Sequence, residues 1–286
     1  PSDATLFARR ALLLSQHDHH ELATSDYLRA YELQPEEPMA LQYVNNMLLV
    51  NRHRDAISFL KQCLQTWPGN IDMHRRLSEI YEQTGQTAKA VQQYDELLRH
   101  DSLDFEAWYN KGILLSQLKD TAGAIQALER SFAIQPVYFN GATLAGYYAH
   151  ALAPRTPALC DQLIAKDVAG ELPDAHFIKG LYYSYTQQYD SAMAQFNEAL
   201  RRDWRFADAH IEKGIIQFEQ KQYDAALQTF TTAATVVNTN PDAYYWMGRC
   251  YEETGNKELA LINYERALAL DRTFDEAREG LRRVRS

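Results

Sequence analysis

The sequence has few of the residues that interrupt regular secondary structure, and it has no long apolar run. Only 12 glycines and 9 prolines punctuate its 286 residues. Between them the apolar residues follow the i, i+3, i+4 spacing of helices, so we expect a nearly all-helical chain. No stretch reaches the roughly 18 apolar residues of a membrane-spanning helix, which argues against direct membrane insertion.

Cysteine is also scarce. The three cysteines, Cys63, Cys160 and Cys250, lie far apart and form no CxxC pair. A zinc knuckle or a disulfide framework requires closer or more numerous cysteines, so these three are expected to be isolated thiols. The sequence contains no GxSxG, HExxH, GxGxxG or phosphate-loop motif, and we expect neither a cofactor nor an enzyme.

Basic residues are in the minority. The chain has 29 lysines and arginines against 38 acidic residues, a net charge of −9. Binding to duplex DNA, RNA or an anionic membrane requires a positive surface, so no nucleic-acid partner is expected. The first residue is Pro1 rather than Met, from which we expect a removed N-terminal export or lipidation segment. The cytoplasm and the bacterial periplasm or cell envelope then both remain open as the compartment.

Three segments of the C-terminal half are similar to one another at a fixed spacing. They begin at residues 173, 207 and 241 with "PDAHFIKG", "ADAHIEKG" and "PDAYYWMG", 34 residues apart both times. If places are counted from the first residue of each segment, glycine recurs at place eight, alanine at places twenty and twenty-seven, and an aromatic ring at place twenty-four. These residues are Gly180, Gly214 and Gly248; Ala192, Ala226 and Ala260; Ala199, Ala233 and Ala267; and Phe196, Phe230 and Tyr264. Small residues at facing places let two helices pack closely as a hairpin, and the ring fills the space beside them.

This pattern resembles the tetratricopeptide repeat (TPR) family over almost the whole chain. The same 34-residue spacing, extended toward the N-terminus, gives a frame of successive repeats. The repeat that begins at residue 105 matches the family most clearly, with Trp108, Gly112, Ala124 and Pro136 at the places typical of the family. The resemblance implies an all-α fold, a right-handed α-solenoid of antiparallel helix hairpins that forms a single domain over residues 1–286. The frame gives eight repeats and a capping helix, at about 4–36, 37–70, 71–104, 105–138, 139–172, 173–206, 207–240, 241–274 and 275–286.

The repeat at 139–172 is degenerate but has the full length of 34 residues. If the 34-residue numbering continues unbroken through this repeat, Gly146 falls at place eight, Ala158 at place twenty and Ala165 at place twenty-seven. Pro154 then lies in the turn and Pro157 in the first turn of the second helix, where the missing N–H costs little. Alanines and Gln162 stand where larger apolar side chains are usual, which predicts thinner packing.

Histidines and paired glutamates are the only candidates for chemistry. Residues 17–20 read "HDHH", which permits a metal site, but adjacent side chains on a turn point in different directions. An exposed turn with one packed imidazole, His20, is the preferred interpretation. The glutamate pairs at 79 and 82 and at 252 and 253 are expected to be solvated helix faces rather than catalytic groups.

The resemblance implies that recognition of another protein takes place on a concave surface lined by the first helix of each repeat. The family's carboxylate clamp uses Lys, Asn and Arg residues, but the corresponding places here hold Leu41, Asn45, Arg76, Glu106 and Asn110, so a chaperone C-terminal tail is not expected. We expect a non-enzymatic scaffold or adaptor that binds a peptide or helix of its partner. The alternative is a truncated helper domain of a larger enzyme or of an envelope transport or assembly machine.

Places five, nine and twelve of the first helices are spaced i, i+4, i+7 and are predicted to face the groove. The apolar residues at these places and two neighbours from the degenerate repeat are Phe177, Leu181, Ile211, Ile215, Phe218, Tyr245, Tyr147 and His150. Polar contacts are expected from Arg75, Tyr109, Asn110 and Arg249. The alternative is a rotated helix with Ile211 and Ile215 in the core, because His210, Lys213 and Gln217 are polar where the packed face should be.

Overall fold

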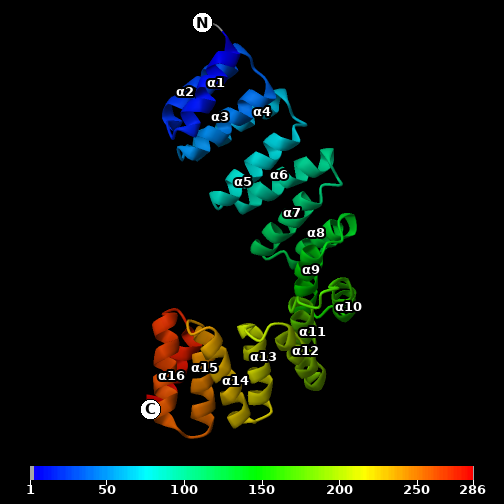
Figure 1. The fold of residues 1–286 in the computed structure, drawn as a ribbon, viewed down its shortest axis with the longest axis vertical. Helices are drawn as coiled ribbons and strands as arrows, with labels where there is room; N and C mark the ends of the chain where they lie inside the picture. Colours follow the sequence, from blue (N-terminus) through cyan, green and yellow to red (C-terminus); the bar gives the residue numbers. More distant parts are fainter. Residues whose placement is uncertain (1–2, 286) are drawn as a thin grey trace. The chain divides into compact units, whose positions relative to one another are not determined.

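The computed structural model describes residues 3–285, which form seventeen α-helices and no β-strand (Figure 1). Pro1, from which N-terminal processing was expected, and Ser286, the end of the predicted cap, lie outside the described residues. None of the helices within residues 3–285 combines the length and the apolar character that crossing a membrane requires.

The helices alternate regularly along the chain. They are α1 (Ala4–Gln16), α2 (His20–Leu33), α3 (Glu37–Leu49), α4 (His53–Thr66), α5 (Ile71–Gln83), α6 (Thr87–His100), α7 (Phe105–Gln117), α8 (Thr121–Ile134), α9 (Tyr138–His150), α10 (Thr156–Lys166), α11 (Asp174–Tyr185), α12 (Tyr189–Arg202), α13 (Ala207–Glu219), α14 (Tyr223–Val236), α15 (Pro241–Glu253), α16 (Lys257–Leu270) and α17 (Asp275–Arg285). The first sixteen form eight hairpins, as the repeat frame predicts.

Each hairpin turns through a residue with positive φ, two residues after the end of its first helix. This residue is at place fifteen in seven of the eight repeats (Asp18, Asn51, Gly85, Lys119, Gln187, Lys221, Gly255). Several first helices begin at an Asp or Asn whose side chain accepts a hydrogen bond from the first turn; Asp104 Oδ1, for example, accepts from the N–H of Ala107 at 2.9 Å. These caps satisfy donors that the helix itself leaves free.

The two helices of a hairpin meet where the sequence placed its small residues. A Cβ added to Gly214 would lie 2.5 Å from Cε1 of Phe230, and one added to Gly180 would lie 2.5 Å from Cε1 of Phe196. Ala192, Ala226 and Ala260, at place twenty, are fully buried. The predicted register of these repeats is therefore confirmed. The three cysteines are buried and unpaired, also as expected.

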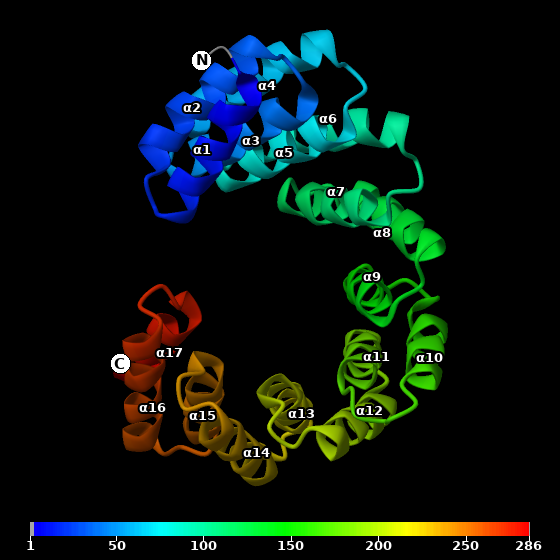
Figure 2. The ribbon, with the colours of Figure 1, turned by 45° about the horizontal axis from the view of Figure 1, so that its top comes forward.

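The chain divides into two compact units, residues 1–136 and 137–286. Their boundary falls between the fourth and fifth repeats, so the described part of the first unit holds α1–α8 and that of the second holds α9–α17. In the second unit the first helices α9, α11, α13 and α15 form one row and the second helices α10, α12, α14 and α16 another (Figure 2). One continuous solenoid over residues 1–286 stays a prediction.

The degenerate repeat corrects the predicted frame. Ala158 and Ala165 are exposed, and the residues that occupy the buried places of α10 are Thr156, Cys160 and Leu163. They have the same spacing as the buried residues of α12 (Ala192, Phe196, Ala199) but lie 36 residues before them, not 34. The second helix is thus out of phase by two residues.

Two changes in the backbone accompany this shift. The positive-φ residue Leu152 comes at place fourteen, one residue early, and the loop after α10 runs over residues 167–173 and contains a second positive φ at Gly170. The Asp167 carboxylate holds this loop by accepting from the N–H groups of Gly170 and Leu172 at 3.1 and 2.9 Å. The shift leaves the amide of Gln162 in solvent, where burial would cost it hydrogen bonds.

The C-terminal helix α17 caps the last hairpin, as predicted. Val284 is 7% exposed, and Leu281 packs against the same apolar cluster. Arg283 donates two hydrogen bonds to the Glu252 carboxylate, from Nε at 2.8 Å and from Nη2 at 2.9 Å. An apolar face toward the repeats and a basic face toward solvent are what the end of a repeat array requires.

Candidate functional site

A hollow of about 350 Å³ lies on the first helices of the second unit. It is called the α13 groove here because α13 contributes the most side chains to it. Four successive first helices and the residue before α15 line it, through His150 of α9, Phe177, Leu181 and Tyr185 of α11, Asp208, Ile211, Glu212 and Ile215 of α13, and Asn240, Asp242 and Trp246 at the start of α15. Figure 2 shows these four helices as neighbours in one row.

The lining has an apolar part. Leu181 and Ile211 are 8% and 7% exposed, so they are core residues that reach the groove with only an edge. Phe177, Ile215 and Trp246 are half-buried and offer more surface. Ile211 and Ile215 pack against the core cluster and also line the groove. Their role in binding a ligand stays a prediction.

The lining also has an acidic part, formed by Asp208, Glu212 and Asp242. Among residues 3–285, no lysine or arginine forms an ion pair with any of the three. Burial, and then the charges of Asp208 and Asp242, raise the pKa of Glu212 to about 7. Burial and the charge of Asp208 likewise raise the pKa of Asp242. The groove therefore gathers three acidic groups with which no described lysine or arginine pairs, and Glu212 is partly protonated at neutral pH.

An aromatic pair forms the α9 end of the groove. The rings of His150 and Tyr185 have their centroids 5.6 Å apart. Partial burial, followed by the charge of Glu212, raises the pKa of the Tyr185 hydroxyl. This hydroxyl is therefore neutral at physiological pH and can donate a hydrogen bond to a ligand.

Five of the residues that the sequence suggested meet in this groove: His150, Phe177, Leu181, Ile211 and Ile215. Sequence reasoning missed the other six, which are Tyr185, Asp208, Glu212, Asn240, Asp242 and Trp246. Helical geometry could have indicated five of them, because places two, six and thirteen share a face with places five and nine. Asn240 precedes α15 and carried no such signal. The missed places carry all the acidic groups of the groove.

Four predicted groove residues of the second unit lie outside this lining. Phe218 packs its ring against Tyr223 and Trp246, with centroids 5.3 Å from each. The Tyr245 ring lies 5.0 Å from the Phe274 ring at an angle of 40°, within the cluster to which α17 contributes. Tyr147, half-buried on α9, is not among the lining residues either.

Arg249 is the fourth. Its guanidinium lies 5.1 Å above the ring of Phe218, and Nη1 donates to the Tyr245 hydroxyl at 3.3 Å. Oxygens of Glu252 and Glu253 lie 4.0 and 3.9 Å from its nitrogens. These contacts within the chain already engage the positive charge that was predicted to meet an acidic ligand group.

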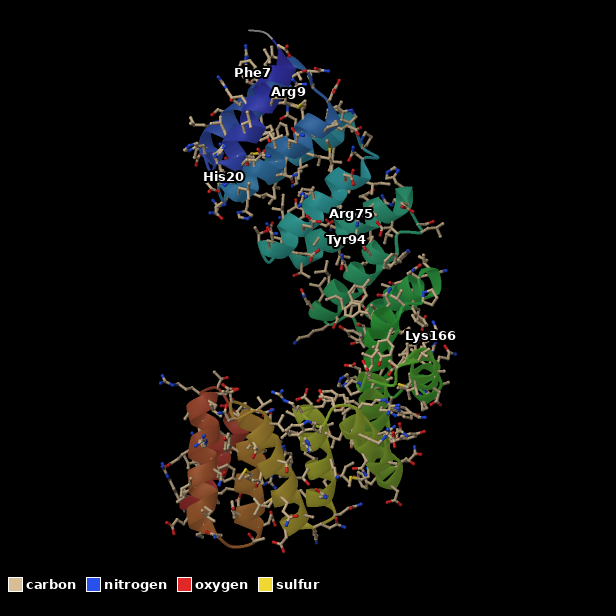
Figure 3. All side chains as sticks on the ribbon, in the orientation of Figure 1. Phe7, Arg9, His20, Arg75, Tyr94 and Lys166 are labelled. Atoms are coloured by element: carbon tan, nitrogen blue, oxygen red, sulfur yellow. The ribbon has the colours of Figure 1, made fainter. Side chains whose placement is uncertain are left out.

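The remaining predicted residues belong to the first unit. Arg75 pairs with Asp104 at 2.5 Å, and Asn110 Nδ2 donates to the Tyr94 hydroxyl at 3.2 Å. Figure 3 labels Arg75 of α5 and Tyr94 of α6 in the first unit. Tyr109 is half-buried on α7. The binding roles of Arg75, Tyr109 and Asn110 stay predictions.

Two of the candidate residues for chemistry, His20 and Glu252, contact other side chains. No group of three or more His, Cys, Asp or Glu within residues 3–285 could hold a metal ion. His20 lies on the first turn of α2, with Nδ1 3.2 Å from the Ser15 hydroxyl. Glu252, expected to be solvated, is instead half-buried and accepts hydrogen bonds from Tyr264 and Arg283. Those hydrogen bonds, led by the one from Arg283, outweigh burial and lower its pKa.

Comparison with known sequences agrees with the repeat frame. Three sequence profiles, each of the tetratricopeptide repeat, match residues 47–111 and 217–282, residues 177–235 and residues 105–138. The matches together cover more than half of the chain, which therefore belongs to the tetratricopeptide repeat family. Members of this family are generally non-enzymatic and typically bind proteins. A search of curated proteins found no significant match.

Solved structures share the fold. PilW, described as a widely conserved type IV pilus biogenesis factor, has a TM-score of 0.62 and 17% identity over 76% of this chain and 98% of its own. The C-terminal part of a TPR repeat-containing protein from Cytophaga hutchinsonii has a TM-score of 0.57 and 14% identity, over 84% and 98%.

A third similar structure is longer than this chain. A chain of the APC/C hetero-tetramer Cut9-Hcn1 has a TM-score of 0.59 and 13% identity over 93% of this chain. This chain spans only 53% of it, about half its length. All three identities are low, so these likenesses establish the TPR solenoid fold and nothing finer.

Proposed function

We propose that this chain is a non-enzymatic interaction scaffold that holds an extended or helical segment of another protein in the α13 groove. The observation that carries the proposal is the groove itself, an open hollow of about 350 Å³ in which half-buried Phe177, Ile215 and Trp246 face a potential ligand. Covering apolar surface releases roughly 25 cal/mol per Å², so an apolar segment gains free energy by binding there.

The span of the groove across four first helices suits a peptide. Four adjacent helices at interaxial distances of about 8–10 Å span roughly 25–30 Å. An extended chain rises about 3.3 Å per residue, so roughly eight residues would cross the row. Side chains from every second residue of an extended segment, or from one face of a helix, would meet the apolar part of the lining.

The test compares groove variants with a matched control. Random 12-residue peptides displayed on phage are selected on the full chain, and the affinity of each selected peptide is measured for Ile215→Ser, Trp246→Ser and Trp204→Ser. Trp204 is a 65% exposed tryptophan in the loop before α13 and outside the groove lining. We expect at least tenfold weaker binding to both groove variants and unchanged binding to Trp204→Ser.

Melting curves for the same variants separate binding from folding. If Ile215→Ser and Trp246→Ser lose about 2 kcal/mol or more of stability yet bind the peptides as the parent does, both residues act only in the core. The groove would then have to be abandoned as the binding site.

A further inference from the structure

We propose that the segment held in the α13 groove carries a lysine or arginine flanked by apolar side chains, with its cationic group placed among Asp208, Glu212 and Asp242. This inference rests on the proposed function above and identifies the chemistry of the partner. Its basis is that the groove joins an apolar surface to three carboxylates from two neighbouring helices.

The repeat explains why the three carboxylates line one hollow. Asp208 and Glu212 are one helical turn apart on α13 and so share a face. Asp242 holds place two of the next repeat, as Asp208 does in its own, and it lines the same hollow. Apolar walls beside them weaken solvent screening, which strengthens the attraction of a bound cation.

Helix electrostatics explain two of these acids but not the third. Asp208 and Asp242 stand in the first turns of α13 and α15, where a negative charge stabilises the helix. Glu212 lies in the second turn of α13, is half-buried, and is repelled by both aspartates. The negative charge of Glu212 is therefore unfavourable in the isolated chain. It becomes favourable when a ligand places a positive charge beside it.

The chain's own cations on these first helices are engaged elsewhere. Lys179 of α11 pairs with Asp161 at 2.6 Å, and Lys213 of α13 donates to the Asn197 amide oxygen at 2.8 Å. Arg249 of α15 lies over the ring of Phe218. Since none of these three groups lines the groove, the complementary charge is left for the partner.

The composition of the lining favours a basic peptide over a bare cation. The three carboxylates are not grouped closely enough to hold a metal ion; no group within residues 3–285 is. Long basic side chains instead lay an aliphatic stem along apolar surface and extend their charge beyond it. Ile215 and Trp246 can take the stem and the flanking apolar residues, while the carboxylates take the head group. An acidic peptide would be repelled.

The test uses the same displayed 12-residue peptides on the full chain. Peptides whose binding depends on Ile215 and Trp246 are sequenced, and one is synthesised with its basic residue intact and with that residue replaced by glutamine. Affinities of both peptides are measured for the parent, Glu212→Gln and Asp224→Asn. Asp224 is an exposed acid in the first turn of α14 and outside the groove, so its variant controls for the loss of one charge.

We expect groove-dependent peptides to be rich in lysine or arginine between apolar residues. Glu212→Gln should weaken the basic peptide about tenfold and leave the glutamine peptide nearly unchanged, and Asp224→Asn should change neither. Glu212→Gln removes repulsion among the acids, so weaker binding would not reflect a less stable fold.

Groove-dependent peptides without basic residues, or equal binding to the parent and to Glu212→Gln, would overturn this inference and leave the proposed function standing. If no selected peptide depends on Ile215 and Trp246, the proposed function fails and this inference fails with it.

Discussion

The glycines that the sequence frame puts at place eight do not share an environment. A Cβ on Gly214 would lie 2.5–2.8 Å from three ring atoms of Phe230, a fully buried side chain. A Cβ on Gly146, in the degenerate repeat, would have no atom within 4 Å. The same substitution at the two sites should therefore change stability in opposite directions.

We predict that Gly214→Ala destabilises the protein by about 1–2 kcal/mol, because overpacking outweighs the gain in helix propensity. Gly146→Ala should stabilise it by about 0.5–1 kcal/mol, since only the propensity gain remains. Urea unfolding followed by circular dichroism measures both. Two changes of the same sign would contradict the packing described for these hairpins.

Glu212 gives the unfolding free energy a pH dependence of predictable sign. Its pKa is about 7 in the folded chain, above the ordinary 4.5, so between these values the folded state binds more protons than the unfolded state. The unfolding free energy should therefore fall as pH rises from about 4.5 to about 7, on the order of 1–3 kcal/mol in total.

Other groups titrate in the same range, so the informative quantity is the difference between the parent and Glu212→Gln. Buried His176, whose pKa is lowered by burial, contributes stability that is lost as pH falls, which is the opposite sign. It is common to both proteins and cancels in the difference. Glu212→Gln should be the more stable protein at pH 8 and should lose this advantage near pH 5; a difference independent of pH would contradict the assignment.

At the scale of the helix, the sequence predicted most hairpins in the right register, and α10 shows where that stops. A glycine followed sixteen residues later by an aromatic residue is a pattern that recurs in each repeat. Gly180, Gly214 and Gly248 therefore predict the register of their hairpins correctly. In the degenerate repeat the signal is alanine, which fits buried and exposed places alike. In the observed register Cys160 and Leu163 are buried and Gln162 is in solvent, an arrangement that repeat length alone does not reveal.

The groove was predictable to the same degree and for a similar reason. Apolar residues on the first helices stand out in the sequence, which is how Phe177 and Ile215 were found. An aspartate in a first turn is usually a solvated, dipole-compensating residue, so Asp208 and Asp242 gave no signal on their own. Only the packing of α13 beside α15 joins them to Glu212 in one hollow.

The register of α10 can be tested by a matched pair of leucine substitutions. Ala226 and Ala158 both fall at place twenty of the sequence frame, but Ala226 is fully buried and Ala158 is exposed. Ala226→Leu should overpack its hairpin and cost about 1–3 kcal/mol. Ala158→Leu should change stability by no more than about 0.5 kcal/mol. Equal losses in thermal unfolding would restore the uninterrupted 34-residue frame.

At the scale of the whole molecule, stability is carried by contacts between neighbouring helices rather than by one central core. The buried residues of the second unit form a chain of clusters, and the cluster around Phe230 and Tyr264 extends from α13 to α17. Repeat arrays of this kind approximate a sum of terms between nearest neighbours. A perturbation at one end should therefore weaken along the array instead of unfolding it as a whole.

Removal of α17 provides that perturbation. The helix packs chiefly on α16 and α15. Its Gly280 lies directly against the Tyr264 ring, and its Ala277 and Val284 are buried. Without residues 275–286 the Tyr264 ring gains solvent exposure, and Glu252 loses the two hydrogen bonds from Arg283. We expect amide hydrogen exchange to accelerate most in α15 and α16, less in α13 and α14, and least in α11 and α12.

Arg282→Ala, which removes an exposed arginine from the same helix, is the control and should leave exchange unchanged. Equal acceleration from α11 to α16 would mean that the unit unfolds as a single cooperative body, and the nearest-neighbour account of its stability would have to be replaced.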